Sequence, residues 1–125
     1  MVLGLGTDIL EVQRIKEGYE KFGERYLVKL FTPAEIKYCL SKAEPELHLT
    51  GRFVAKEAVV KALSHVYNGP FAWTEIEIRN EKSGIPKVFL LDRLAKVLPA
   101  NSEIVISISH TGHSAVSVAI IQKLN

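Results

Sequence analysis

One long helical segment, residues 47–65, constrains the fold more than any other part of this chain. At about 100° per residue, Arg52, Lys56, Glu57 and Lys61 fall within roughly half of the helix circumference. Small or apolar residues occupy the other half. A helix with one apolar face buries that face against other elements. We therefore expect this helix to pack against the rest of a folded domain.

Shorter elements surround this helix in the sequence. Turn signals and apolar alternation predict five strands, over 2–9, 75–79, 87–91, 103–109 and 114–121. Helical spacing predicts four further helical segments, over 11–22, 25–30, 32–41 and 92–98. Thr32 and Glu35 form a capping-box pattern, and Pro45 marks the loop after that helix. The sequence thus predicts one α+β domain over residues 1–125, with a mainly antiparallel sheet packed against helices.

The bulk composition excludes several classes of protein. Sixteen basic and 14 acidic side chains leave a charge of +2, which is too small a surplus for a nucleic-acid-binding face. Cys39 is the only cysteine, so no internal disulfide is possible and a reducing compartment is favoured. The first residues lack the pattern of a signal peptide, and no apolar run is long enough for a membrane span. We expect a cytoplasmic protein that binds neither nucleic acid nor membrane.

Charged residues on the long helix suggest an anion-binding function. Arg52 and Lys56 are four positions apart and repel each other unless an anion lies beside them. A polyphosphate ligand would supply that anion. The alternative is that both side chains extend into water. Glu57 and Lys61 can form an ion pair along the same helix.

Asp8 is the only charged residue of the strand over 2–9. Alternation places Gly4 and Gly6 on its face, which predicts free space beside the carboxylate. Asp8 and Glu57 together would supply the hard oxygen ligands that Mg²⁺ uses. The alternative is that Asp8 caps the helix that follows the strand.

Two turns carry further candidate residues. Ser107, His110 and Thr111 place hydroxyl and imidazole groups around the end of a strand, where they could bind phosphate or move a proton. Gly84, two positions before Pro86, would allow a ligand to approach the backbone. For each turn the alternative is ordinary turn chemistry without a ligand.

Six short segments, read in chain order, resemble the holo-acyl-carrier-protein synthase family of phosphopantetheinyl transferases. They are GLGTDI at 4–9, FTPAE at 31–35, GRFVAKEA at 51–58, IEI at 76–78, GIP at 84–86 and SISH at 107–110. The resemblance implies transfer of 4′-phosphopantetheine from coenzyme A to a serine of an apo-acyl carrier protein, in support of fatty acid biosynthesis. It also implies adenosine 3′,5′-bisphosphate as the second product and the fold of these transferases.

The same resemblance implies roles for individual residues. Asp8 and Glu57 would hold Mg²⁺ against the coenzyme pyrophosphate, and Arg52, Lys61 and His110 would lie around the phosphates. Gly84 and Pro86 would border the nucleotide. We also expect Ser107 and Thr111 to bind the coenzyme.

For the proton of the carrier serine, Glu57 or a metal-bound water is the leading acceptor, with Glu35 and His110 as further candidates. The carrier would dock on Arg14, aided by Lys21 or Arg25. Small members of the family are homotrimers with sites at subunit interfaces, and we expect the same here.

Two features depart from the family pattern. Residues 64–69 replace a stretch that is often rich in glycine, and Ser114 stands near a position that is often aromatic. The main alternative function is a non-catalytic module that binds acyl carriers through its basic helix. Such a module would not need both Asp8 and Glu57.

Overall fold

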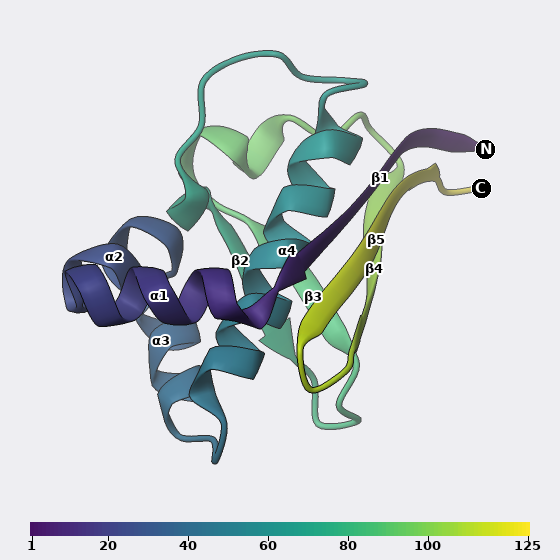
Figure 1. Cartoon of the computed structure of the whole chain (residues 1–125). Coiled ribbons are helices and arrows are strands. Elements are labelled where there is room, and N and C mark those ends of the chain that lie inside the picture. Colours follow the sequence, from purple (N-terminus) through teal and green to yellow (C-terminus); the bar gives the residue numbers. More distant parts are fainter.

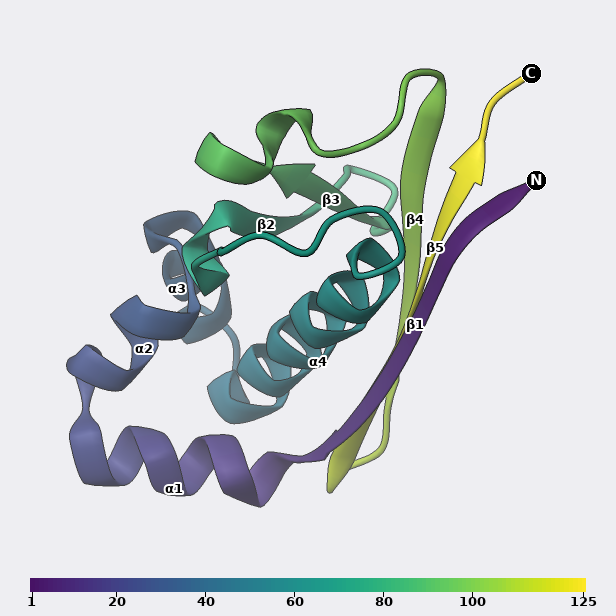
Figure 2. The ribbon, with the colours of Figure 1, turned by 90° about the horizontal axis from the view of Figure 1, so that it is seen from above.

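Helix α4 (Pro45–Leu63) lies at the centre of the protein, in a computed structural model that describes residues 1–125. A three-stranded sheet covers one side of it, with the strand order β1-β5-β4. These strands are β1 (Val2–Glu11), β4 (Ser102–His110) and β5 (Ser114–Lys123), and both pairings are antiparallel. Figure 2 shows α4 between this sheet and the other elements. The predicted helix is therefore the core element of the fold.

The remaining elements cover the other sides of α4 (Figure 1). Three helices follow β1: α1 (Val12–Phe22), α2 (Glu24–Leu30) and α3 (Pro33–Leu40). Strands β2 (Ile76–Asn80) and β3 (Pro86–Leu90) form a separate antiparallel sheet. Two 3₁₀ helices flank this sheet, η1 (Trp73–Glu75) and η2 (Asp92–Lys96). The predicted α+β class with antiparallel pairing is confirmed, although the strands form two sheets instead of one.

The ends of α3 and α4 show how local sequence sets the helix boundaries. The capping box at α3 forms as predicted: Glu35 N donates to Thr32 Oγ1 at 3.3 Å, and Thr32 N donates to Glu35 Oε1 at 2.9 Å. Pro45 begins α4 instead of lying in a loop. The fixed φ of proline suits the first turn of a helix, where its missing N–H needs no partner.

Strand β1 packs so closely on α4 that side chains are excluded between them. A Cβ atom on Gly4 would overlap the carbonyl oxygen of Ala62, and one on Gly6 would overlap that of Ala58. The prediction of free space on this face of the strand was therefore wrong. The glycines let the helix backbone approach the strand, and this approach brings α4 side chains beside Asp8.

The opposite face of the three-stranded sheet carries no helix (Figure 2). Exposed apolar side chains on this outer face include Leu5, Ile9, Val105 and Val116. The strand register places Ile120 between Leu5 and Val105, and it pairs Ile9 with Val116. None of the helices in the protein combines the length and the apolar composition that crossing a membrane requires.

Candidate functional site

Asp8 on β1 lies beside two residues of α4, Glu57 and Lys61. Lys61 Nζ is 3.1 Å from Asp8 Oδ1 and donates to the carbonyl oxygen of Thr7 at 3.0 Å. Burial raises the pKa of Glu57, the negative charge of Asp8 raises it further, and so does the hydrogen bond that protonated Glu57 donates to the Asp8 carboxylate, while Lys61 and Arg14 lower it. The two carboxylates are thus neighbours that repel each other, with a cation on one side.

Asp8 does not act as the cap of the following helix. The residue at the cap position of α1 is Glu11, and no side chain accepts a hydrogen bond there. This finding removes the structural alternative for Asp8 and leaves its carboxylate directed toward Glu57 and Lys61.

The Asp8–Glu57 pair fits a magnesium ion better than a metal held by protein alone. No group of three or more His, Cys, Asp or Glu side chains gathers anywhere in the chain. Mg²⁺ commonly binds through one or two carboxylates and completes its shell with phosphate oxygens and water. Two adjacent carboxylates therefore match the ligand set of a metal that is shared with a phosphate substrate.

A cavity of about 380 Å³ opens beside these carboxylates. Its lining includes Asp8 and Glu57 together with Arg14 and Lys21 of α1. Arg25 is not part of the lining. Two of the three predicted carrier-docking residues therefore share a surface with the predicted metal ligands.

Four other predicted residues meet at a second cavity, of about 200 Å³. Arg52, Gly84, Pro86 and His110 all line it. Arg52 and Glu57 are five positions apart, which separates them by about 140° around the helix axis. Within one chain, the predicted nucleotide residues and the predicted metal ligands therefore lie on different sides of α4. Lys61 lies on the side of the predicted metal ligands.

Ser107 and Thr111 line neither of these cavities. Ser107 lies on the outer face of the sheet, and the alternation along β4 turns it away from the side of His110. Thr111 Oγ1 accepts hydrogen bonds from the backbone N–H groups of His113 and Ser114, each at 3.1 Å. The turn interpretation is favoured for Thr111, and no ligand contact is indicated for Ser107 within one chain.

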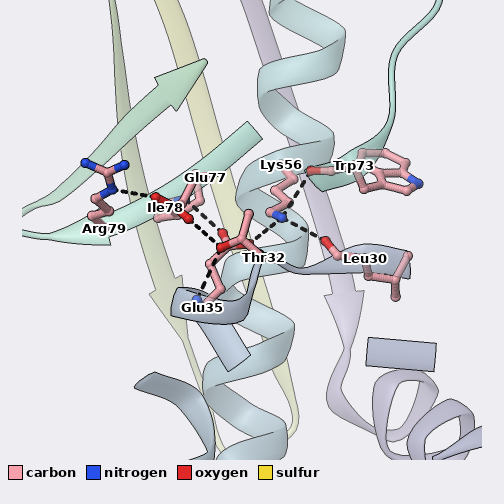
Figure 3. A network of polar contacts seen from close by, with 8 residues as sticks. All are labelled: Leu30, Thr32, Glu35, Lys56, Trp73, Glu77, Ile78 and Arg79. Atoms are coloured by element: carbon pink, nitrogen blue, oxygen red, sulfur yellow. Dashed lines mark hydrogen bonds and ion pairs between the residues drawn. The ribbon is translucent and has the colours of Figure 1, made fainter. Parts of the chain in front are cut away.

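Lys56 is buried in an internal network instead of facing solvent or a ligand (Figure 3). Its Nζ lies 2.5 Å from Glu35 Oε1 and donates to the carbonyl oxygens of Leu30 at 2.7 Å and Trp73 at 3.1 Å. Burial lowers the pKa of Lys56, and the charge of Glu35 opposes that effect. The anion that Lys56 needs is therefore supplied by the protein itself, and both alternatives drawn from the sequence were wrong for this residue.

The network continues from Glu35 to the surface at β2 (Figure 3). Glu35 Oε2 accepts a hydrogen bond from the N–H of Ile78 at 2.8 Å. Thr32 Oγ1 donates to Glu77 Oε2 at 2.5 Å, and Arg79 Nε donates to Glu77 Oε1 at 2.5 Å. Both oxygens of Glu35 are engaged, and the residue is buried. These contacts favour a structural role for Glu35 over the role of proton acceptor.

Sequence patterns did not reveal three polar residues at the second cavity: Tyr38, His48 and Asn80. His48 is four positions before Arg52 on the same helix, so helical spacing could have identified it. No local pattern distinguishes Asn80 or Tyr38. Both reach Arg52 only because α3 and β2 pack against α4.

Comparison with known sequences supports the resemblance seen in the motifs. Residues 4–118 match the sequence model of the 4′-phosphopantetheinyl transferase superfamily. The chain is 43% identical over 120 residues to the holo-[acyl-carrier-protein] synthase of Protochlamydia amoebophila, covering 96% of this chain and 98% of the relative. It is 44% identical over 121 residues to the enzyme of that name from Thermodesulfovibrio yellowstonii, covering 97% and 99%.

Solved structures share the fold as well. The crystal structure of holo-[acyl-carrier-protein] synthase from Neisseria meningitidis matches with a TM-score of 0.88 and 30% identity, covering 98% of this chain and 100% of that one. The Bacillus anthracis enzyme, in complex with CoA (3′,5′-ADP), matches with a TM-score of 0.78 and 27% identity, covering 98% of each chain. Because sequence and fold agree over almost the whole length, the chain belongs to the 4′-phosphopantetheinyl transferase superfamily.

Proposed function

We propose that this protein transfers 4′-phosphopantetheine from coenzyme A to a serine of an apo-acyl carrier protein in a Mg²⁺-dependent reaction. The products are a holo-acyl carrier protein, which supports fatty acid biosynthesis, and adenosine 3′,5′-bisphosphate. The observation that carries the proposal is the Asp8–Glu57 pair beside Lys61, on a chain whose relatives are holo-acyl-carrier-protein synthases. The coenzyme complex of the Bacillus anthracis relative supports coenzyme A as the co-substrate.

The reaction breaks the bond between the phosphorus that bears the pantetheine arm and the bridging oxygen of the coenzyme A pyrophosphate, and that oxygen leaves with adenosine 3′,5′-bisphosphate. The carrier serine oxygen forms the new bond to that phosphorus. Bound Mg²⁺ would neutralise the charge that develops on the phosphate oxygens. Glu57 is the proposed acceptor of the serine proton, because it lines the cavity beside α1 at which the carrier would place that serine. The ammonium group of Lys61 lies beside the Asp8 carboxylate.

The nucleotide half of coenzyme A occupies the cavity lined by Arg52, Gly84, Pro86 and His110. Arg52 supplies a buried positive charge for a phosphate, and Gly84, with a φ of 89°, forms the turn at the rim. His110, at the end of β4, contributes an imidazole on the same side. These groups bind and orient the coenzyme and leave the chemistry to the carboxylate side of α4.

The working enzyme is proposed to be a cytoplasmic homotrimer with sites at subunit interfaces. Arg52 and Glu57 lie on different sides of α4, so a nucleotide cavity from one copy and a carboxylate pair from the next can together form one site. The exposed apolar side chains on the outer face of the sheet supply an area for such contacts. Cys39 is a buried free thiol, which suits a reducing compartment.

The carrier protein is proposed to dock on α1, next to the carboxylates. Arg14 and Lys21 line the same cavity as Asp8 and Glu57, so an acidic carrier helix at this position would hold its serine near the proton acceptor. Arg25 stands in the following helix and is the weaker candidate.

The direct test is to incubate the protein with coenzyme A, Mg²⁺ and an apo-acyl carrier protein, and to weigh the carrier by mass spectrometry. The expected result is a mass increase equal to one phosphopantetheine, which disappears when the modified serine is replaced by alanine. A carrier that binds to the protein but never gains mass would instead support the non-catalytic carrier-binding module.

A further inference from the structure

Arg52 is a buried cation without an acidic partner. The residue is 6% exposed, and its Nη2 donates to Asn80 Oδ1 at 2.7 Å. The guanidinium carbon lies 4.2 Å from the centre of the Tyr38 ring. Its Nε is buried and has no hydrogen-bond partner. A buried charge in this condition is costly to the fold, because no carboxylate compensates it.

Two other basic residues, one near Arg52 on α4 and one adjacent to Asn80 on β2, do have carboxylate partners. Lys56, on the next turn of α4, is paired with Glu35, and Arg79, next to Asn80 on β2, is paired with Glu77. The protein therefore supplies a carboxylate to these two cations but places a neutral amide against Arg52. Asparagine and aspartate have the same shape, so the difference between them is one of charge and not of reach.

The cavity around Arg52 offers no negative charge to neutralise it. The cavity that it lines contains His48 and His110 and no acidic side chain. Burial lowers the pKa of His48, and the charges of Lys42, Arg52 and His110 lower it further, with only Glu44 opposing. The field in this cavity therefore favours an anion.

Asn80 also connects Arg52 to the turn at the rim of the cavity. Its Nδ2 donates to the carbonyl oxygen of Gly84 at 3.2 Å. That turn is closed by Gly84 N donating to the carbonyl oxygen of Glu81 at 2.8 Å. One amide thus joins the guanidinium on α4 to the loop between β2 and β3.

We propose that Asn80 is a positioning residue, which orients the guanidinium of Arg52 toward a phosphate group and, being neutral, leaves its charge free for that phosphate. This inference rests on the proposed function, because it takes the phosphate to be one carried by the coenzyme. It adds that the electrical neutrality of residue 80, and not only its hydrogen bonds, determines affinity.

The test compares two substitutions of Asn80 that differ in charge. Asn80→Asp and Asn80→Ala both lose the hydrogen bond to Gly84, but only Asn80→Asp supplies a carboxylate to Arg52. The probe is adenosine 3′,5′-bisphosphate, with binding measured by isothermal titration calorimetry and melting temperature by calorimetry. Asn101→Asp, in the turn at the opposite end of β4 from His110, adds the same charge at a remote exposed position and is the matched control.

We expect the two variants to rank in opposite orders for melting temperature and for affinity for the bisphosphate. Asn80→Asp should melt at a higher temperature than Asn80→Ala, because it forms an ion pair with Arg52, yet bind the bisphosphate at least about tenfold more weakly than Asn80→Ala. Asn101→Asp should bind like the unchanged protein. In an Arg52→Met background, the difference in affinity between Asn80→Asp and Asn80→Ala should disappear.

Equal affinities for Asn80→Asp and Asn80→Ala would overturn the inference, because charge at residue 80 would then not matter. Failure of the proposed function looks different. If the unchanged protein never modifies a carrier but shows this ranking with the bisphosphate, the transferase assignment is wrong and the role of Asn80 stands. If carriers are modified and Asn80→Asp binds the bisphosphate normally, the role of Asn80 is wrong and the transferase assignment stands.

Discussion

Lys56 Nζ lies 2.5 Å from Glu35 Oε1, and neither side chain is exposed to solvent. This pair joins the middle of α4 to the first turn of α3, and two backbone carbonyl groups complete the coordination of the ammonium group. The next residue along α4 is Glu57. The same short segment therefore anchors the helix in the core and presents a carboxylate to the candidate site.

Replacing Glu35 by glutamine should lower the free energy of unfolding by about 3–5 kcal/mol, because a buried cation loses its counter-charge. Glutamine can still accept the N–H of Thr32, so the capping box itself is preserved. Urea unfolding followed by circular dichroism measures the change. Adding Lys56→Met to Glu35→Gln should recover part of the loss, since both charges are then gone. A Glu35→Gln protein as stable as the unchanged one would show that the pair is not needed for folding.

Asp8→Ala and Glu57→Ala should each abolish phosphopantetheine transfer at every Mg²⁺ concentration. Each substitution removes one of the two proposed carboxylate ligands and would weaken the hold on a metal shared with the pyrophosphate. The melting temperature of Glu57→Ala should change little, because the loss of packing is offset by the end of its repulsion with Asp8. Glu11→Ala, at the end of the same strand, is the control and should retain activity. Near-normal turnover of Glu57→Ala in a Mg²⁺ titration would refute the assignment.

Reversing charge on α1 should weaken the association with the carrier. Arg14→Glu and Lys21→Glu should each raise the apparent Michaelis constant for the carrier several-fold, with little change in coenzyme binding. Lys21→Glu is the cleaner variant, because Arg14 also lowers the pKa of Glu57. Added salt should slow the unchanged enzyme more than either variant, since screening acts on the interaction that they lack.

Arg25→Glu provides the matched control for that experiment. Arg25 is also basic, but it stands in α2 and does not line the cavity beside the carboxylates. The Arg25→Glu substitution should raise the Michaelis constant for the carrier by less than Lys21→Glu does. If Lys21→Glu and Arg14→Glu bind the carrier normally at low salt, the carrier docks on another face.

The contribution of the Glu75 carboxylate to stability should be lost when the protein is brought to acidic pH. A hydrogen bond from the Arg93 side chain is the main cause that lowers the pKa of Glu75 to about 2, and the backbone N–H groups of Ala72 and Arg93 add to it. Because the folded protein holds the charged form, the stabilisation is complete above the ordinary pKa of 4.5 and is lost as the pH falls toward about 2. The melting temperature of Glu75→Gln should therefore lie below that of the unchanged protein at pH 7, and the gap should narrow below pH 4.5. A gap that stays constant across this range would mean that the charge of Glu75 contributes nothing.

The secondary structure was largely predictable because its causes are local. The capping box at Thr32 and Glu35, the alternation along β4 and β5 and the turn between them each depend on residues a few positions apart. The pairing of Asp8 with Glu57 was also anticipated, although the reason given for space beside Asp8 was wrong. Gly4 and Gly6 provide close packing and not an open site, since a sequence does not say which element will fill the room left by a missing side chain.

The sequence by itself determined most of the helices and strands and the family, and it identified four residues at each of the two cavities. Only the tertiary structure decided what each charge on α4 faces. Lys56 meets Glu35 from a position 21 residues away, and Arg52 meets Asn80 from one 28 residues away. Both cations looked alike along the helix, because local spacing describes a helix face and not its neighbours. Whether a buried cation receives a carboxylate or an amide depends on which distant element packs against it, and that is decided by the fold as a whole.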